Sequence, residues 1–221
     1  MRRVLFLATT LIFVISQNAN ATLIDRGNGL IYDDALDITW LQDANYAQTS
    51  GYDDDGAMTW TEANNWAAQL VFGGYDDWRL TSVGDNPSDH GGNTGYNMIT
   101  GELGYMYYIN LGNESDEYST GCNPNCFANT SFIDLDTGLT ASFENVVSYH
   151  YWYSETNPNP PNEAWTFITL DGSQRSIGKT NRVYSWAVRD GDVTAVTVSE
   201  PSTILLLLLG ALGLIKRKNF L

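Results

Sequence analysis

The amino-acid sequence predicts a single α+β domain. Three observations carry this prediction: two short strand patterns between residues 29 and 41, two amphipathic helical patterns in the middle, and several strand-like segments in the last third. Early strands, then helices, then a run of strands is the order typical of α+β proteins. About 180 residues separate the apolar ends of the chain, which is enough for one domain with its own core. We expect a compact domain with two helices and a late antiparallel sheet.

The first elements are two short strands. The segments 29–34 (GLIYDD) and 38–41 (ITWL) are apolar runs on either side of an Asp-rich turn. Short runs of this composition bounded by turn residues favour strands. Both strands should belong to one sheet.

The clearest helical pattern starts at Thr59. Thr59 and Glu62 have the spacing of a capping box, in which the two side chains bind each other's backbone N–H groups. Four apolar residues then follow at helical spacing: Ala63, Trp66, Ala67 and Leu70. We expect Gly73 and Gly74 to end this helix, and residues 78–80 (WRL) to form a short buried strand.

A second helical pattern, which is weakened by two glycines, begins at Thr100. Its apolar face comprises Leu103, Met106, Tyr107 and Leu111. Gly112 and Asn113 should end it. The composition from 113 to 130 is rich in Asn, Ser, Asp and Gly, which predicts a long surface loop.

The last third of the domain reads as strands. The strand-like segments are 151–154, 164–170, 174–177 and 185–189. Asp171-Gly172 lies where a two-residue hairpin turn is expected. The segment 157–161 (NPNPP) predicts an exposed loop because its prolines cannot join a sheet.

The N-terminus has the order of a secretory signal. Arg2 and Arg3 precede a nearly continuous apolar run over 4–16, and Ala19 and Ala21 fit an A-x-A cleavage site. We therefore assign residues 1–21 to a signal peptide and begin the mature chain at Thr22. An uncleaved membrane anchor is the alternative.

The C-terminus carries a second apolar run. Residues 204–215 contain only Ile, Leu, Gly and Ala, and the basic cluster 216–218 (KRK) follows. A helix of this length covers about 18 Å, against roughly 30 Å of hydrocarbon in a bilayer. It is short for a permanent span, and the basic cluster would stay on the cytoplasmic side. We expect a transient inner-membrane anchor.

The net charge limits the classes of molecule that the protein can bind. Five of the eleven Lys and Arg residues lie in 1–21 and 204–221, which hold no acid, so residues 22–203 between them have six basic and 26 acidic residues and a net charge of −20. Nucleic acid is excluded, because its phosphates need Lys and Arg to displace counterions. Anionic lipid is disfavoured. Cations, neutral polysaccharide and basic partners remain, although solubility outside the cell also accounts for the acidity.

The only two cysteines, Cys122 and Cys126, lie close together in GCNPNC at 121–126. Export would place them in an oxidising compartment, which favours a local disulfide. A zinc site would need further ligands, and the histidines His90 and His150 have no metal-ligand spacing to the cysteines.

The C-terminal order of motif, apolar run and basic cluster resembles the PEP-CTERM sorting signal. The motif residues are Ser199, Glu200, Pro201 and Ser202, after Val198; the family usually has Pro at the position of Ser199. The resemblance assigns residues 195–221 to a sorting signal. It implies processing by an exosortase, a membrane cysteine transpeptidase or protease, in a Gram-negative bacterium that makes exopolysaccharide. An ordinary tail anchor leaves Glu200 and Pro201 unexplained.

Residues 22–194 form the predicted domain, and most of it resembles the C-terminal domain family of a collagen-like bacterial adhesin (Lcl C-terminal). The matching segments are 29–33 (GLIYD), 39–41 (TWL), 66–67 (WA), 74–80 (GYDDWRL), 151–154 (YWYS), 164–165 (AW) and 186–189 (WAVR). The chain departs from the family at Thr81-Ser82, where Pro-Thr is usual. The resemblance implies a C-type-lectin-like fold, related to that of formylglycine-generating enzyme; fold alone does not assign function.

The sequence gives little indication of an enzyme. The spacing of Cys122 and Cys126 does not match the copper ligands of formylglycine generation, and no Gly-x-Ser-x-Gly motif is present. Adjacent acids such as Asp76 and Asp77 point apart on a strand, so they do not indicate a glycosidase. We name no catalytic residues and no cofactor.

Two acidic loops have the hard oxygen ligands that calcium prefers. They are residues 53–56 (DDDG) and 134–138 (DLDTG), and neither matches an EF-hand loop. Solvated acidic turns are the alternative.

Trp78 and Arg79 allow two interpretations, a sugar-binding pair or core residues with an ion pair from Arg79 to Asp76 or Asp77. Alternation along the chain favours an exposed aromatic surface made of Tyr105, Tyr107, Tyr108, Tyr149, Tyr151 and Tyr153.

These patterns together predict an exported, exosortase-processed protein of the cell surface or extracellular matrix whose domain binds an extracellular ligand, such as polysaccharide. A structural or assembly protein of the envelope without a ligand site is the alternative. A polysaccharide hydrolase is the third hypothesis.

Overall fold

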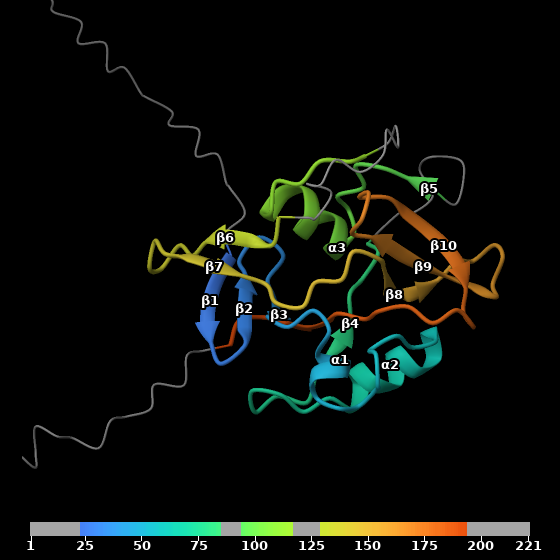
Figure 1. The fold of residues 1–221 in the computed structure, drawn as a ribbon, viewed down its shortest axis with the longest axis horizontal. Coiled ribbons are helices and arrows are strands. Elements are labelled where there is room, and N and C mark those ends of the chain that lie inside the picture. The colour runs from blue at the N-terminus through green and yellow to red at the C-terminus, as the bar shows by residue number, and fades with distance from the viewer. Residues whose placement is uncertain (1–22, 85–93, 117–128, 194–221) are drawn as a thin grey trace, which may run out of the picture.

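The computed structural model describes residues 23–84, 94–116 and 129–193. They form a mixed helical and antiparallel-sheet domain, which confirms the predicted α+β class (Figure 1). Short helices lie on two sides of the sheets, with α1 and α2 below and α3 above in the view of Figure 1. Among the described residues, no helix is both long enough and apolar enough to cross a membrane.

The larger sheet has five strands in the order β1-β2-β3-β11-β4. Their bounds are β1 Leu23–Gly27, β2 Leu30–Asp33, β3 Ile38–Leu41, β11 Ala187–Asp190 and β4 Arg79–Leu80. β2 and β3 confirm the two predicted early strands, and β4 confirms the predicted short one. The assignment of the last strand to the late sheet was wrong. β11 pairs instead with β3 and β4, with Val188 opposite both Trp40 and Arg79.

The second sheet has four strands in the order β5-β10-β9-β8, namely Thr94–Gly95, Gln174–Gly178, Glu163–Ile168 and His150–Thr156. The predicted two-residue turn at Asp171-Gly172 was too short. Ile168 N–H donates to Ser173 O at 2.8 Å, and the loop between β9 and β10 spans the five residues 169–173. The loop at 157–161 is present, but Asn157 is buried and donates to Ser176 Oγ at 2.8 Å.

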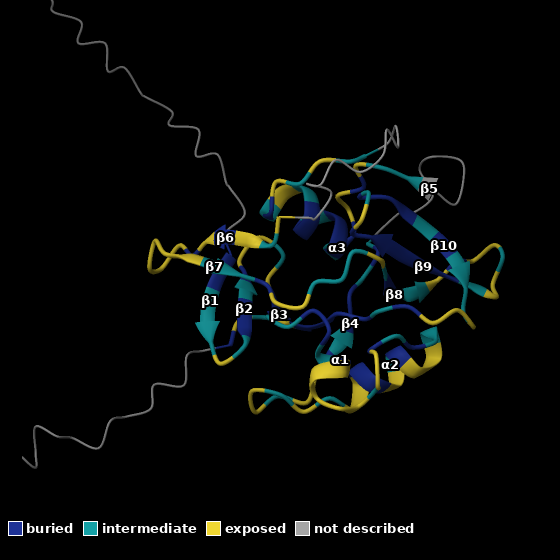
Figure 2. Cartoon of the chain, viewed as in Figure 1, coloured by how far each residue is buried: buried dark blue, intermediate teal, exposed yellow. Residues whose placement is uncertain are grey.

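A two-stranded ribbon forms a third, separate pairing that belongs to neither sheet. β6 (Ser131–Ile133) and β7 (Thr140–Ser142) pair in antiparallel register, with Phe132 opposite Ala141. The sequence patterns did not predict this ribbon, because each strand has only three residues. Figure 2 shows that its tip is exposed.

The capping box at Thr59 is confirmed. α2 spans Trp60–Gln69, and the Thr59 and Glu62 side chains each accept from the other residue's backbone N–H. Of its predicted apolar face, Ala63, Trp66 and Ala67 are buried and Leu70 is partly buried. The helix ends at Gln69, earlier than expected, because Leu70 is extended. The glycines form a turn at positive φ that connects Phe72 and Tyr75. The short helix α1 (Tyr46–Thr49) precedes α2.

The second predicted helix forms as one α-helical turn, α3 (Glu102–Tyr105), followed by a π-helical turn, η1 (Met106–Asn110). Its predicted apolar face is buried. Gly104 is required here, because a Cβ would lie 1.9 Å from Met98 O. In the π-turn, Asn110 donates to Asp33 Oδ2 at 2.6 Å and so connects this helix to the first sheet.

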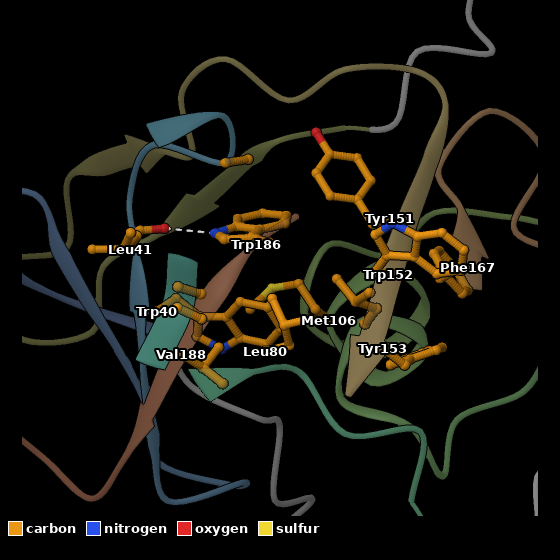
Figure 3. Close-up of a cluster of buried hydrophobic side chains, with 14 of the residues drawn as sticks. Trp40, Leu41, Leu80, Met106, Tyr151, Trp152, Tyr153, Phe167, Trp186 and Val188 are labelled. Carbon is orange, nitrogen blue, oxygen red and sulfur yellow. Dashed lines mark hydrogen bonds between the residues drawn. The ribbon is translucent and has the colours of Figure 1, made fainter. Parts of the chain in front are cut away.

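The core is dominated by aromatic side chains between the two sheets (Figure 3). Trp186 contacts Trp40 with 5.1 Å between ring centroids, and its Nε1 donates to Leu41 O at 2.7 Å. Trp152 Nε1 donates to Met58 O at 2.9 Å, just before α2. For these two tryptophans, the acceptor offsets the cost of taking the indole N–H group out of water.

The predicted aromatic surface was largely wrong. Tyr107, Tyr151 and Tyr153 are buried, and so is Trp152 between the latter two. Side chains along a strand point alternately to the two faces of the sheet. Every second side chain is exposed only if one of these faces is left uncovered. Both faces of β8 are covered here, so neighbours on opposite faces are all buried.

Candidate functional site

Trp78 and Arg79 are structural residues. Trp78 is buried in the core beside Phe72. The guanidinium of Arg79 donates to both oxygens of Glu102, at 2.8 and 2.9 Å, and to Asp190. Burial confirms the core interpretation for Trp78, whereas the Arg79 side chain is one-third exposed and forms ion pairs.

The predicted partner of Arg79 was wrong. Asp77 pairs instead with Arg189 on β11, through two hydrogen bonds of 2.8 and 2.9 Å, and the Arg189 guanidinium lies 4.1 Å from the centre of the Tyr75 ring. The pair lowers the pKa of Asp77.

The two acidic loops use their carboxylates internally. Asp53 accepts from Asp55 N–H and Gly56 N–H and pairs with Arg182 at 3.0 Å. Asp134 accepts from the Thr137 hydroxyl and from two backbone N–H groups. Within the described ranges, no group of three or more His, Cys, Asp or Glu side chains is placed to hold a metal ion. Calcium binding stays a prediction.

Several predicted residues lie outside the described ranges. They are the cleavage residues Ala19 and Ala21, the cysteines Cys122 and Cys126, His90, and the sorting motif Ser199, Glu200, Pro201 and Ser202.

The best-formed candidate site is a surface that we call the tyrosine platform, made of Tyr149, His150 and Tyr184 with Arg175 and Asp171 beside them. Tyr149 is 50% exposed. Its ring meets the His150 ring edge-on at 5.1 Å between centroids and the Tyr184 ring at 6.2 Å. Aromatic pairs at these separations prefer such geometry. The platform therefore presents an ordered, partly exposed aromatic surface.

Backbone hydrogen bonds hold the platform in place. Tyr184 N–H donates to His150 O at 3.0 Å, and Thr169 N–H donates to Tyr149 O at 3.1 Å. Behind the platform, Tyr184 contacts the buried ring of Tyr151, which in turn contacts Trp186. The exposed rings thus rest on the core, so little side-chain entropy remains to be lost on binding.

The charged edge of the platform lies at the β9–β10 loop. Arg175 approaches Asp171 at 3.8 Å and donates to Ser173 Oγ at 3.3 Å. Its Nε atom has no hydrogen-bond partner among the described residues. Asp171 accepts from the backbone N–H and the hydroxyl of Ser173. A forked donor and a carboxylate therefore lie near the aromatic rings.

His150 is neutral at physiological pH. Burial, with a smaller contribution from the positive charge of Arg175, lowers its pKa to about 4, and Asp171 opposes this shift. Its Nδ1 lies 3.1 Å from Thr166 Oγ1, and that hydroxyl donates its own proton to Arg175 O. Nδ1 must therefore carry the proton, which leaves Nε2 as the acceptor of the ring.

A second concavity lies between β1 and the β6–β7 ribbon and has a volume of about 300 Å³. Asp25 and Asp134 are among its lining residues. Burial raises the pKa of Asp134, but hydrogen bonds from Thr137 and from backbone N–H groups outweigh burial and lower it. A lowered pKa does not suit Asp134 to the role of general acid in glycoside hydrolysis, which needs a raised pKa.

Sequence reasoning found only part of the platform. Tyr149 was predicted to be exposed, and it is. Tyr184 and Arg175 were missed, because only the pairing of Tyr151 with Tyr184 and the register of β10 bring them there. Comparison with protein-family models and with curated proteins finds no match for this chain.

Proposed function

We propose that the protein is an exported, exosortase-processed protein of the PEP-CTERM class, located at the cell surface or in the extracellular matrix, and that its domain binds polysaccharide on the tyrosine platform. The observation that carries this proposal is the half-exposed Tyr149 ring held against His150 and Tyr184 beside the charged groups of Arg175 and Asp171.

The chemistry of the platform suits a sugar. The apolar face of a pyranose packs on an aromatic ring, and its hydroxyl groups need both donors and acceptors around that ring. Arg175 supplies donors, Asp171 supplies an acceptor, and the neutral His150 supplies Nε2. The strongly acidic domain favours a neutral or basic polysaccharide over an acidic one.

The arrangement of the chain supports export. The described domain begins at Leu23, two residues after Ala21, and its last strand ends at Asp190, ahead of the sorting motif. The folded unit thus fits between the two apolar segments, as delivery across a bilayer and later processing require. The mixed helix and sheet architecture supports the finer proposal of a C-type-lectin-like fold.

Binding to exopolysaccharide tests the proposal. We expect the signal-processed protein to bind in pull-down and glycan-array measurements, and Tyr149→Ala to weaken binding by about tenfold, which corresponds to about 1.4 kcal/mol. Tyr184→Ala should act in the same direction. Tyr52→Ala is the matched control, because Tyr52 is 51% exposed, lies between α1 and α2 and is not one of the platform residues.

Two outcomes would contradict the proposal. One is the absence of binding to any glycan, with and without calcium, which favours an assembly protein without a ligand site. The other is equal loss of binding in the Tyr52→Ala and Tyr149→Ala variants, which would place the contact away from the platform.

A further inference from the structure

The tip of the β6–β7 ribbon exposes three large aliphatic side chains. Ile133, Leu135 and Leu139 are 61%, 64% and 69% exposed, and we call them the apolar tip. Single exposed aliphatic residues are ordinary, but three in seven residues form a local cluster, and such clusters mark interaction surfaces.

The apolar tip is preorganised. Asp134 N–H donates to Leu139 O at 2.9 Å, and Gly138 N–H donates back to Asp134 O at 2.7 Å. The Asp134 side chain points inward and accepts from the Thr137 hydroxyl. Because these bonds fix the backbone of the turn, binding through the exposed aliphatic side chains would not have to order it.

The tip lies at the end of the domain from which the chain continues to its C-terminus. Arg26 on β1 joins the two regions: its guanidinium pairs with Asp136 in the tip at 2.9 Å and with Asp192, just after β11, at 2.6 Å. Figure 1 shows β1, β6 and β7 together at this end, away from β9 and β10. The tip and the chain exit therefore share one end of the molecule.

The sequence beyond this exit limits how far the domain can lie from a membrane. Ten residues, 194–203, separate Val193 from the apolar run 204–215. Even fully extended they reach about 35 Å. A tether of this length holds the tip at a high effective concentration near the bilayer, so a weak contact is sufficient.

We propose that, while the protein is anchored by its C-terminal run, the apolar tip inserts into the interfacial region of zwitterionic lipid in the same membrane. The inference rests on the export and anchoring that we propose as part of the function. Arg26 offsets the charges of Asp136 and Asp192 beside the tip. The domain remains strongly acidic, which disfavours anionic lipid. Insertion would hold the tyrosine platform, on the other sheet, away from the bilayer.

Depth-dependent quenching tests this proposal. The full chain without its signal peptide is reconstituted through its tail into phosphatidylcholine vesicles that contain brominated lipid. In a Leu135→Trp variant, we expect the added fluorescence to shift to shorter wavelength and to be quenched about threefold more than in Val71→Trp. Val71 is the matched control, because it is 70% exposed just after α2.

The outcomes separate the tip from the anchor. A chain that dissociates from the vesicles on alkaline washing overturns the anchoring and, with it, the inference. A chain that stays anchored but shows equal quenching in the two tryptophan variants overturns insertion of the tip alone. Self-association without lipid that is lost in Leu135→Ser/Leu139→Ser would assign the tip to a second copy of the chain instead. None of these three results alters the polysaccharide test, which measures glycan binding by the signal-processed protein.

Discussion

The two sheets of this domain are assembled from chain segments of very different separation. In the four-stranded sheet, β8, β9 and β10 follow one another and pair as neighbours. In the five-stranded sheet, the last strand inserts between β3 and β4, and Trp186 donates to Leu41 across 145 residues of sequence. Pairing between consecutive strands therefore specifies three of the four strands of one sheet, with β5 joining β10 from far along the chain, whereas the other sheet requires the two ends of the domain to meet.

The largest effect is expected where the segment at Trp186 and β11 packs against β3. The first prediction tests whether this long-range contact dominates the stability of the domain. Trp186→Ala removes a buried ring that contacts Trp40, Phe143 and Tyr151. We expect the free energy of unfolding, measured by urea denaturation of the soluble domain, to fall by about 3–5 kcal/mol. A loss below about 1 kcal/mol, the size of an ordinary substitution, would contradict the role of closure.

The same conservative change in each sheet sharpens the comparison. Trp186→Phe leaves Leu41 O without its donor, whereas the Nε1 of the buried Trp165 on β9 has no partner among the described residues. We expect Trp186→Phe to cost about 1–2 kcal/mol more than Trp165→Phe, because only the first leaves a buried acceptor unsatisfied. Equal losses of unfolding free energy in the two variants would show that the hydrogen bond from Trp186 to Leu41 does not cause the difference.

Arginine to lysine substitutions compare the two sheets at their surfaces. Arg189 on β11 binds both oxygens of Asp77 and lies over Tyr75, so Arg189→Lys should cost about 1–2 kcal/mol. Arg175 on β10 reaches Asp171 only at 3.8 Å, so Arg175→Lys should stay within about 0.5 kcal/mol. Thermal or urea unfolding of both variants measures the difference. A larger loss for Arg175→Lys than for Arg189→Lys would contradict the importance of the two-pronged contact between Arg189 and Asp77.

A further comparison is a pH dependence that belongs to the second sheet. The folded-state pKa of His150 is about 4, below the ordinary histidine value of 6.5, so the unfolded chain binds more protons between these pH values. Its contribution to stability is complete above about pH 6.5 and is lost as pH falls towards 4. We expect His150→Gln to flatten the melting temperature across this window, as followed by circular dichroism.

A separate acid transition provides the internal control. The pKa of Asp77 is lowered by its hydrogen bonds to Arg189, so this carboxylate contributes stability that is lost only as pH falls below the ordinary Asp range. The wild type and His150→Gln should therefore lose stability together below about pH 4. If the two curves stay parallel above that pH as well, His150 is not the titrating group.

The sequence predicted what local chemistry determines. The capping box at Thr59 fixes the start of α2, and the apolar runs of β2 and β3 need only each other to pair. It did not predict the sheet to which β11 belongs, because an apolar run does not identify its neighbours. The burial of Tyr151 and Tyr153 was missed for a related reason: alternation does not reveal a strand covered on both faces.

The candidate site was predictable to a smaller extent. Exposure of Tyr149 follows from the sequence, since it lies just before β8. Its contact with Tyr184 depends on the crossing of the segment before β11 beside β8, and the position of Arg175 depends on the β9–β10 register. Both are tertiary features. The apolar tip was missed because its flanking strands are too short to give a periodic signal.

The central position of β11 also has a mechanical consequence. If the C-terminal tail holds the protein to a surface, a force that pulls on the bound polymer also pulls on the chain between the domain and the tail. This force acts on the end of β11. The Asp192 contact with Arg26 takes the first load, and the strand behind it is bonded to β3 on one side and β4 on the other. Extraction must then break both rows of hydrogen bonds together, whereas a strand at the rim, such as β1, could peel from a single neighbour one bond at a time.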